Sequence, residues 1–393
     1  MILRSSCIMF SMDKLRIAID TSYMDRRPGK GTATVIRHIA EELLKYREMF
    51  DVTLVHREPI PEDSLYGQFG ELIIPRVQLP KFSGTFSELF FFLTTRRRFD
   101  VYYFSYSRLL PFFWLAPAKY IVFDIMDGGP QTAGYQGKAK GKLPWYVRLF
   151  LWRVDAFVTL SEFGKQGVCK TYGIEPKKVH VAYLGVDERF KPSDNIVSAR
   201  AHLKSSYNFP ERYILCVSRF DPHKNILNLL DAYAELTRIH GPQEMLVFVG
   251  GKHMPDYSAQ VDERIKKLKL EGKVFIAPYI ADEDMPAVYS CALCMVFPSF
   301  YEGFGLPVIE AMACKTPVVI SNIAALTEVA GSHAFVVDPH DARSIAQGIQ
   351  SALTDPRREQ HLNEARSWTE SFTWKNYGKA TVEILAKTAK GKL

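Results

Sequence analysis

The chain has few cysteines and no long apolar run. Its 393 residues include six cysteines, scattered without the density of a secreted disulfide scaffold, so a reducing cytoplasm is the expected compartment. The absence of any stretch of about 18 uncharged apolar residues argues against a membrane-spanning helix. The segment 1–12 lacks an adequate apolar core and a small-residue cleavage site, and it is therefore not expected to act as a signal peptide.

Low-complexity segments are also absent, and the composition is that of a soluble globular protein. Hydrophobic residues make up 47% of the chain and charged residues 24%, so long disordered stretches are not expected. The length predicts two or three domains. A formal net charge of +7 attracts anions, but it does not choose among a nucleotide, a phospholipid surface and a nucleic acid.

Short apolar runs alternate with helix-length segments along most of the chain. Continuous apolar strands separated by helices are typical of parallel sheets covered on both faces. Two such series predict an α/β protein with two doubly wound domains. The first series is 15–20, 52–56, 101–104, 120–124, 156–161 and 179–184, and the second is 214–218, 246–250, 274–277, 295–298, 318–321 and 335–338.

A turn-rich segment, Lys191–Asn195, separates the two series. We therefore predict an N-terminal domain over 12–190 and a C-terminal domain over 205–370, followed by a C-terminal helix over 371–393. The helical pattern itself runs from Trp368 to about residue 387. In open α/β sheets ligands bind beyond the carboxyl ends of the strands, so the substrate cleft is expected between two facing domains.

The most informative segment is Ser299–Glu310, which reads SFYEGFGLPVIE. It places Glu302 in a glycine turn after an apolar strand, with Pro307 where a helix could begin and Glu310 in the first helical turn. Free backbone N–H groups at a helix start bind anions. Two carboxylates beside an anion site would repel the anion unless they bind another part of the ligand. They can accept hydrogen bonds from hydroxyls while amides and cations hold phosphate, and a nucleotide sugar offers both kinds of group.

This segment resembles the two-glutamate signature of retaining GT-B glycosyltransferases, the large group that includes sucrose and glycogen synthases and bacterial mannosyltransferases. Pro298 and Ser299 precede the pair, and Ala311-Met-Ala313 follows it. The resemblance covers nearly the whole chain. It implies two Rossmann-like domains facing a cleft, and a C-terminal helix that crosses back to the first domain.

The resemblance further implies transfer of a hexose-type sugar from a nucleoside-diphosphate sugar to a hydroxyl of a glycan or lipid-linked acceptor, in polysaccharide synthesis and without another cofactor. The family uses the second glutamate, here Glu310, for the ribose hydroxyls, and the first, Glu302, near the sugar and its anomeric carbon. The backbone of the turn would contact the donor through Gly303, Phe304, Gly305 and Leu306.

Two cations follow the first strand of the second series. Arg219 stands at the strand's carboxyl end and Lys224 just before a helix, where a diphosphate is held by charge and by free amides. The matching residues of the family contact the donor diphosphate. Gly250, after the next strand, permits a close approach of backbone to donor, although a plain strand-end turn explains it nearly as well. The nucleobase is expected against the backbone of 277–279.

Departure of a nucleoside diphosphate requires stabilisation of negative charge, which some enzymes obtain from a divalent metal. No Asp-x-Asp or histidine cluster occurs here in a matching position, whereas Arg219, Lys224 and a helix N-terminus supply positive potential. We therefore predict a metal-independent transfer and no metal site. Cys291 and Cys294 form a C-x-x-C in apolar surroundings without a second pair, which favours core packing.

The N-terminal half offers glycines that fit the family's first-domain loop, Gly29 and Gly31, which could close over the donor and the acceptor; an ordinary turn is the alternative. Family members often carry His-Asp after the strand that here ends at Asp124. Asp124 matches the Asp, but Phe123 stands where the histidine would be. This departure puts the acceptor side in question, and Asp127 is a candidate to compensate.

Glu162 is a further candidate for the cleft, although helix capping by Ser161 explains part of its motif. The region 82–117 combines aromatic clusters with Arg96, Arg97 and Arg98. These residues could rest peripherally on the inner face of an anionic plasma membrane, but a helix packed on the sheet with a basic exposed end is the favoured interpretation. The donor signature argues against nucleic acid as a partner.

Because no residue stands out as an enzymic nucleophile, the expected mechanism is front-face attack, with the departing phosphate oxygen helping to take the acceptor proton. Two alternatives stay open. One is a GT-B hydrolase or sugar-nucleotide epimerase. The other is a non-catalytic nucleotide-sugar-binding protein, which is motivated by Phe123 at the position of the expected histidine.

Overall fold

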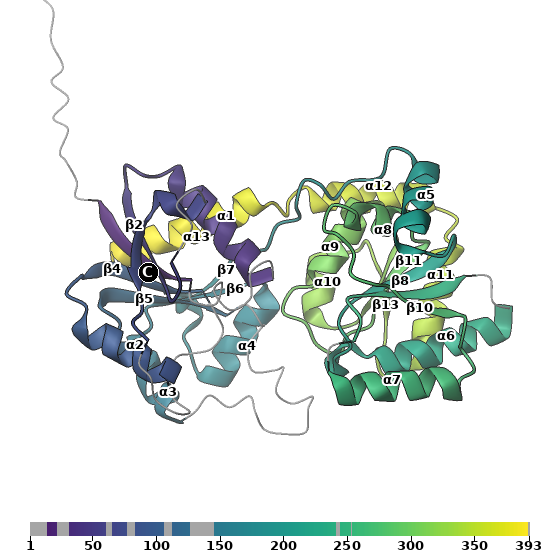
Figure 1. Ribbon diagram of the computed structural model, residues 1–393, viewed down its shortest axis with the longest axis horizontal. Coiled ribbons are helices and arrows are strands. Elements are labelled where there is room, and N and C mark those ends of the chain that lie inside the picture. Colours follow the sequence, from purple (N-terminus) through teal and green to yellow (C-terminus); the bar gives the residue numbers. More distant parts are fainter. Residues whose placement is uncertain are drawn as a thin grey trace, which may run out of the picture. The chain divides into compact units, whose positions relative to one another are not determined.

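The computed structural model describes residues 14–21, 31–59, 65–76, 83–105, 112–125, 145–240, 244–252 and 254–391. They divide into two units (Figure 1). The N-terminal unit holds the described residues up to Asp124, Trp145–Phe157 and the chain from Gly378 onward, and the C-terminal unit holds Ile125 and Val158–Tyr377. Of the predicted site residues, Gly29 and Asp127 lie outside the described residues.

The first sheet has seven strands in the order β3-β2-β1-β4-β5-β6-β7. Central strand β1 pairs parallel with β2 and with β4, so that Ile17 lies opposite Val52 and Val101. All three of these side chains are buried, as a sheet covered on both faces requires. The strands are β1 Leu15–Asp20, β2 Phe50–His56, β3 Gly70–Ile73, β4 Phe99–Phe104, β5 Ala118–Ile125, β6 Ala156–Thr159 and β7 Val179–Val181.

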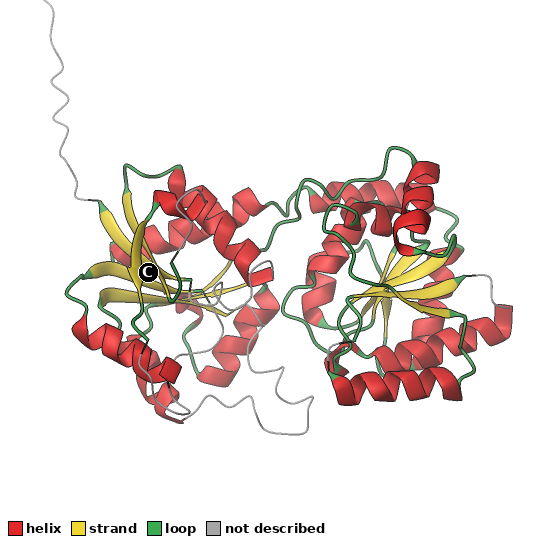
Figure 2. Cartoon of the chain, in the orientation of Figure 1, coloured by secondary structure: helices red, strands yellow, loops and turns green. Residues whose placement is uncertain are grey.

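Helices on both faces cover this sheet (Figure 2). They are α1 Gly31–Leu44, α2 Ser83–Thr94, α3 Trp145–Phe150, α4 Glu162–Tyr172 and α13 Trp374–Ala389, with short 3-10 turns η2 Leu65–Gln68, η3 Phe113–Leu115, η5 Leu151–Arg153 and η6 Pro176–Lys178. In α13, a Cβ on Gly378 would lie 2.8 Å from Cβ of Glu42 and 3.2 Å from the carbonyl oxygen of His38. This glycine therefore lets the backbone of α13 pack closely on α1.

The second sheet has six strands in the order β10-β9-β8-β11-β12-β13, and its registered pairs are all parallel. The strands are β8 Tyr213–Val217, β9 Met245–Val249, β10 Val274–Ile276, β11 Cys294–Phe297, β12 Val318–Ser321 and β13 Phe335–Val337. The strand order reverses between β8 and β11, which creates the switch point at which open α/β sheets bind ligands.

Alternate residues of β8 enter different cores. Tyr213 and Leu215 belong to one buried cluster, and Ile214 and Cys216 to the other, so helices cover both faces of the second sheet. Cys291 and Cys294 are buried in these clusters, one on each side. The helices are α5 Ile196–Tyr207, α6 Ile226–His240, α7 Pro255–Lys267, α8 Met285–Cys291, α9 Leu306–Ala313, α10 Ala324–Ala330, α11 Ala342–Leu353 and α12 Arg358–Thr369, with the 3-10 turn η7 Pro222–Lys224.

Two elements differ from the sequence predictions. Strand β3 was not predicted, because it is a short edge strand without a continuous buried apolar run. The helical stretch predicted from Trp368 is wrong at its start: α12 ends at Thr369 and α13 begins at Trp374. Between them the chain turns at Glu370 and Ser371, and Thr373 then forms a bridge with Val186, which a residue inside a continuous helix could not do.

Candidate functional site

The predicted donor residues gather at the carboxyl edge of the second sheet, beside its switch point. Neighbouring strands β8 and β11 end there, and each leads into a loop that carries predicted site residues. Arg219 and Lys224 follow β8, and the glycine turn with Glu302 follows β11. The carboxyl edge at a reversal of strand order is the usual ligand position in this class of sheet.

Lys224 and Glu302 form an ion pair, with Nζ of the lysine 2.5 Å from Oε1 of the glutamate. Their side chains are only 15% and 12% exposed. The ammonium of Lys224 also lies 5.0 Å from the centre of the ring of Phe297, the last residue of β11. Two residues that are 78 positions apart in the chain thus meet in a largely buried charge pair.

Asn225 holds the Lys224 loop in place. Its φ is 60°, a left-handed conformation that asparagine tolerates better than most residues. Its side-chain amide donates hydrogen bonds to the carbonyl oxygens of Pro298, at 2.9 Å, and Pro339, at 2.7 Å, which follow β11 and β13. Asn225 was not predicted as a site residue, although an asparagine between a Pro-initiated turn and a helix is a usable signal.

Arg219 is more accessible than Lys224, since its side chain is 46% exposed and its guanidinium lies 3.4 Å from Oδ2 of Asp221. The backbone beside it is tightly packed. Gly250 has a φ of 102°, and a Cβ at that position would lie 2.9 Å from the carbonyl oxygen of Ser218. Glycine is therefore required at 250 by the close approach of the two loops that follow β8 and β9.

The one large apolar side chain of the glycine turn, that of Phe304, points into the protein. Phe304 is buried, with ring contacts to Tyr183 and Phe372. Gly305 has a φ of 98°, and a Cβ there would lie 2.5 Å from a methyl carbon of Leu326. The carbonyl oxygen of Gly303 accepts a hydrogen bond from the Ser161 hydroxyl at 3.1 Å.

Helix α9 starts at Leu306, directly after the turn, with Pro307 as its second residue. The prediction that Glu310 lies in the first helical turn is therefore wrong, because the helix begins one residue before Pro307 and Glu310 is its fifth residue. The carboxylate of Glu310 accepts a hydrogen bond of 2.7 Å from the hydroxyl of Tyr289, a residue that the sequence analysis did not identify.

Burial raises the pKa of Glu310 to about 7, against the stabilising effects of the Tyr289 hydroxyl and of Arg189 on the carboxylate. The negative charges of Asp187 and Asp282 act in the same direction as burial. The two signature glutamates thus occupy different environments, one paired with a cation and the other with a neutral donor.

In the first sheet, Asp124 is fully buried near the end of β5, where Oδ2 accepts a hydrogen bond of 2.6 Å from the Tyr103 hydroxyl. The adjacent Phe123 is also fully buried and stacks on Phe104, with ring centres 5.6 Å apart. The side chain at the family's histidine position therefore belongs to the hydrophobic core. Gly31 is the first residue of α1.

Glu162 is the first residue of α4, and its N-cap, Ser161, accepts a hydrogen bond from the Gly164 amide at 3.0 Å, as the capping interpretation predicted. The amides of Glu162 and Phe163 donate to the carboxylate of Glu328, at 2.7 and 3.0 Å. A carboxylate at a helix N-terminus is favoured by the helix dipole. This helix start is thus already occupied by a negative charge from the protein itself.

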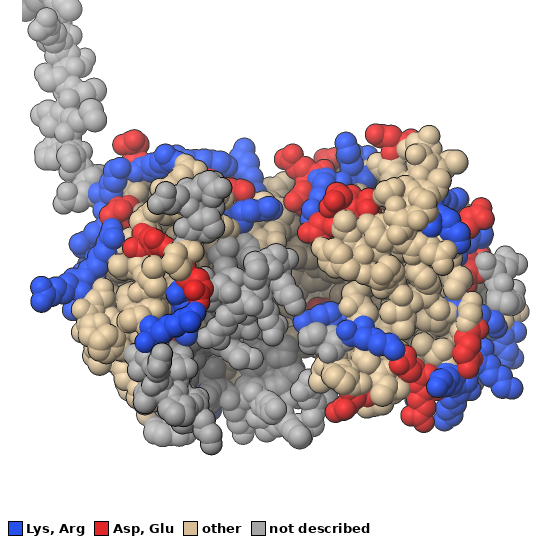
Figure 3. Space-filling model, in the orientation of Figure 1, with Lys and Arg blue, Asp and Glu red and all other residues tan. Residues whose placement is uncertain are grey.

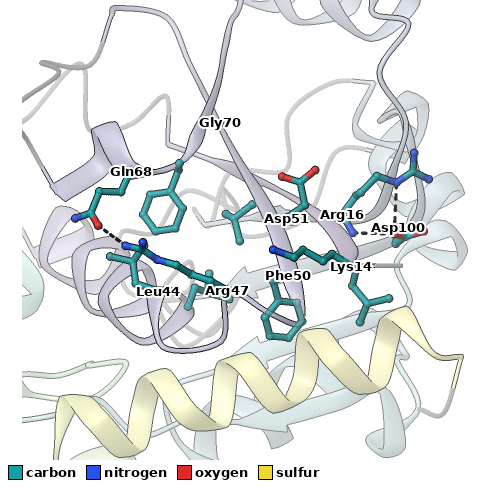
Figure 4. Close-up of a pocket in the computed structure, with 13 residues that line it drawn as sticks. Lys14, Arg16, Leu44, Arg47, Phe50, Asp51, Gln68, Gly70 and Asp100 are labelled. Carbon is teal, nitrogen blue, oxygen red and sulfur yellow. Dashed lines mark hydrogen bonds and ion pairs between the residues drawn. The ribbon is translucent and has the colours of Figure 1, made fainter. Parts of the chain in front are cut away.

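A hollow of about 880 Å³ lies at the opposite, amino-terminal edge of the first sheet (Figure 4). Lys14, Arg16 and Arg47 lie around it, with Arg16 paired to Asp100 at 3.7 Å. None of the predicted site residues that the structure describes lines this hollow. Within the described part of the chain, no group of three or more His, Cys, Asp or Glu residues is placed to hold a metal, and no helix is long and apolar enough to cross a membrane.

Two doubly wound domains, with a charge pair and a glycine turn at the switch point of the second, define a GT-B protein. Solved structures share this fold over most of the chain. Sucrose-phosphate synthase from Thermosynechococcus elongatus has a TM-score of 0.73 at 20% identity, covering 95% of this chain and 99% of that one. Anabaena Alr3699/HepE in complex with UDP and glucose has a TM-score of 0.74 at 19% identity, covering 95% and 99%.

The chain belongs to the group 1 glycosyltransferases: the model of Glycosyltransferase Family 4 matches residues 29–190, and that of Glycosyl transferases group 1 matches 199–368. Among its relatives, O-antigen chain mannosyltransferase B of Escherichia coli is 32% identical over 229 residues, 57% of this chain and 58% of that protein. O-antigen chain mannosyltransferase RfbU of Salmonella typhimurium is 30% identical over 205 residues, 52% of this chain and 53% of that protein.

The matched segment thus spans little more than half the length of either relative. The predicted group 1 glycosyltransferase family and the predicted GT-B fold are confirmed.

Proposed function

We propose that the protein is a retaining, metal-independent hexosyltransferase that moves a sugar from a nucleoside diphosphate to a hydroxyl of a glycan or lipid-linked acceptor in bacterial surface polysaccharide synthesis. The observation that carries this proposal is the buried Lys224–Glu302 pair beside the glycine turn at the switch point. The mannosyltransferase relatives support a hexose donor, and the Anabaena structure with UDP and glucose supports a nucleoside diphosphate.

The diphosphate is assigned to Arg219 and Lys224. Arg219 is exposed enough to reach a ligand, and Lys224 has three N–H donors, one of which serves Glu302. The N-terminus of α9 adds the positive end of the helix dipole, which favours negative charge. Together these groups would stabilise the charge that develops on the departing diphosphate without a metal.

The rest of the donor is assigned to the two glutamates and to the backbone. Glu302, oriented by Lys224, would accept hydrogen bonds from sugar hydroxyls near the anomeric carbon, and the amides of Gly303 to Leu306 would contact the sugar or phosphate. Glu310, oriented by Tyr289, would accept hydrogen bonds from both ribose hydroxyls. Gly250, which lets its loop pack closely on Ser218, would also let the backbone there approach the donor.

For the transfer itself we propose front-face attack. The acceptor oxygen forms its bond to the anomeric carbon on the face from which the diphosphate leaves, and a departing phosphate oxygen takes the acceptor proton. Acceptor-side roles are proposed for Gly29, Gly31, Asp127 and Glu162. Asp124, which is buried beside Tyr103, is proposed to position the end of β5 or the reacting groups.

A donor panel tests this proposal. Purified protein is incubated with UDP, GDP and dTDP sugars, with glycan or lipid-linked acceptors, and with or without EDTA, and products are analysed by NMR for anomeric configuration. Transfer with retained configuration that survives EDTA is expected. Abolition by EDTA would contradict metal independence, and an inverted product would contradict retention.

A non-catalytic nucleotide-sugar-binding protein is the second candidate, favoured by one observation: the residue at the family's histidine position, Phe123, is buried in the core. Thermal stabilisation by a nucleotide sugar, without transfer or hydrolysis under any acceptor condition, would establish this candidate instead. A GT-B hydrolase would release free sugar at the same rate with and without an acceptor.

A further inference from the structure

Helix α2 has apolar residues on both of its faces. Phe91 and Phe92 are buried, and Phe92 packs edge-on against Tyr102 of β4, with ring centres 5.8 Å apart. The helix therefore packs on the sheet, as the favoured interpretation of this region predicted. Its outer face carries Phe90, which is 49% exposed, and Leu93, which is 67% exposed. A helix that is apolar all round normally has a partner on each side.

The exposed apolar surface continues beyond α2 within the N-terminal unit. Helix α2 contacts η3, and Trp114 of η3 stacks on Phe150 of α3 with ring centres 3.7 Å apart. On either side of Phe150, Leu149 is 58% exposed and Trp152 is 71% exposed. We call this the α2–α3 surface, and its exposed apolar side chains are Phe86, Phe90, Leu93, Leu115, Leu149 and Trp152.

Arginines border this surface. Arg96, Arg97 and Arg98 follow α2 directly and are exposed, and Arg148 of α3 is exposed as well. In the sequences of α2, η3, α3 and η5 the single acidic residue is Glu88, which is buried and paired with Arg57. Figure 3 shows Lys and Arg side chains beside the uncharged surface over α2.

The arginines that follow α2, which form a basic border of the α2–α3 surface, also reach the hollow of Figure 4. Arg97 lies 5.8 Å from the centre of the Phe99 ring and 3.7 Å from the carboxylate of Asp51, which lines the hollow together with Lys14 and Arg47. Cations therefore continue from the end of α2 along the amino-terminal edge of the first sheet, where they outnumber the two aspartates of the hollow, Asp51 and Asp100. A positive border of this extent attracts a broad anionic surface more than a single small ligand.

We propose that the α2–α3 surface docks on an anionic lipid bilayer, with its Phe, Leu and Trp side chains in the headgroup region and its arginines against the lipid phosphates. Amphipathic surfaces bind bilayers by this combination of shallow apolar insertion and attraction to anionic lipids. A second copy of the chain fits less well, because a two-fold contact through this surface would bring arginines against arginines. Docking does not depend on the proposed transfer reaction.

Vesicle sedimentation of the full chain tests the apolar part. Vesicles of phosphatidylcholine alone are compared with vesicles of phosphatidylcholine and phosphatidylglycerol, and wild type should bind the second kind selectively. Phe90→Ser/Leu93→Ser should lower the partition coefficient about tenfold, from the lost insertion of two apolar side chains. The matched control is Val197→Ser/Ile239→Ser, which removes two exposed apolar side chains from the C-terminal unit and should bind as wild type does.

The charged part is tested in the same assay. Arg96→Glu/Arg98→Glu should weaken binding at low salt and less so at high salt, because screening already suppresses the attraction. Lys266→Glu/Lys267→Glu, on exposed positions of α7, is the matched control. Far-UV circular dichroism and melting temperature verify that each variant is folded.

Three outcomes would overturn the proposal: wild type that does not distinguish the two kinds of vesicle, surface variants that bind as well as their matched controls, or binding that is independent of salt. Loss of a solution dimer in Phe90→Ser/Leu93→Ser, measured by analytical ultracentrifugation without any vesicle binding, would assign the surface to a second copy. Donor turnover without lipid is measured separately, so a failure of docking is distinguishable from a failure of the proposed transferase function.

Discussion

Replacement of Lys224 by methionine tests whether the buried ion pair organises the donor site. The variant keeps most of the side-chain volume but leaves the Glu302 carboxylate, 12% exposed, without its cation. Removing one partner of a buried pair typically costs about 3–5 kcal/mol. Because the two side chains are 15% and 12% exposed rather than fully enclosed, we expect the lower end, about 3 kcal/mol.

A loss of this size should be visible in thermal unfolding. For a domain of about 150–250 residues, a loss of about 3 kcal/mol corresponds to a decrease of roughly 6–12 °C in the melting temperature of the C-terminal unit. The matched control is Arg264→Met, which breaks a more exposed pair with Asp231 whose side chains are 34% and 28% exposed. Exposed pairs contribute about 0–1 kcal/mol, so the control should shift the melting temperature by a few degrees at most.

The double variant Lys224→Met/Glu302→Gln completes a double-mutant cycle. Neither residue then carries a charge, so most of the lost stability should return, with a coupling energy of about 2 kcal/mol between the two positions. The measurement is differential scanning calorimetry on wild type, Lys224→Met, Glu302→Gln, the double variant and the control Arg264→Met. The reasoning is refuted if Lys224→Met melts like Arg264→Met, or if the double variant is no more stable than Lys224→Met.

Three further changes give predictions. Burial raises the folded-state pKa of Glu310 from 4.5 to about 7, so its contribution to stability is present below pH 4.5 and is lost as the pH rises through 7. Glu310→Gln should therefore remove this decline from the free energy of unfolding, measured with denaturant between about pH 5 and 8. An unchanged dependence on pH in the variant would contradict this prediction. Asn225→Ala should lower the free energy of unfolding by about 2–4 kcal/mol in the same measurement, because it deletes two buried hydrogen bonds and leaves alanine at a φ of 60°. Asn225→Gly relieves the backbone strain but does not restore the hydrogen bonds, so it should recover only part of the loss. Gly305→Ala should weaken nucleotide affinity at least about tenfold, since the added Cβ would displace Leu326 and the turn. Isothermal titration calorimetry measures the affinity. An affinity equal to that of wild type would show that the geometry of the turn is not required.

The strands were predictable from sequence because both faces of each sheet are buried. Strand β1 was predicted over Leu15–Asp20 and β12 over Val318–Ser321, as the structure has them, since a continuous apolar run is what a doubly covered strand requires. Strand β3 escaped detection because an edge strand needs no such run. The end of α12 escaped because the bridge between Val186 and Thr373 is a long-range contact that no local pattern encodes.

The residues of the candidate site were predictable where they form a local sequence motif. They were not predictable where they meet only through folding. The segment Ser299–Glu310 and the two cations were readable as types of residue at a given spacing. The pairing of Lys224 with Glu302 was not, because it depends on the adjacency of β8 and β11 in the folded sheet. Tyr289 was missed for the same reason, since it reaches Glu310 from another helix, α8.

Donor turnover by a Lys224 variant tests the assignment of the donor site most directly. Release of nucleoside diphosphate from the best donor of the panel is measured for wild type, Lys224→Ala and Arg264→Ala, in the presence of EDTA. If Lys224 bears leaving-group charge, Lys224→Ala should lose more than about tenfold in rate, or about 1.4 kcal/mol of transition-state stabilisation, while Arg264→Ala turns over like wild type. An unchanged rate in folded Lys224→Ala would remove this residue from the site and contradict the assignment.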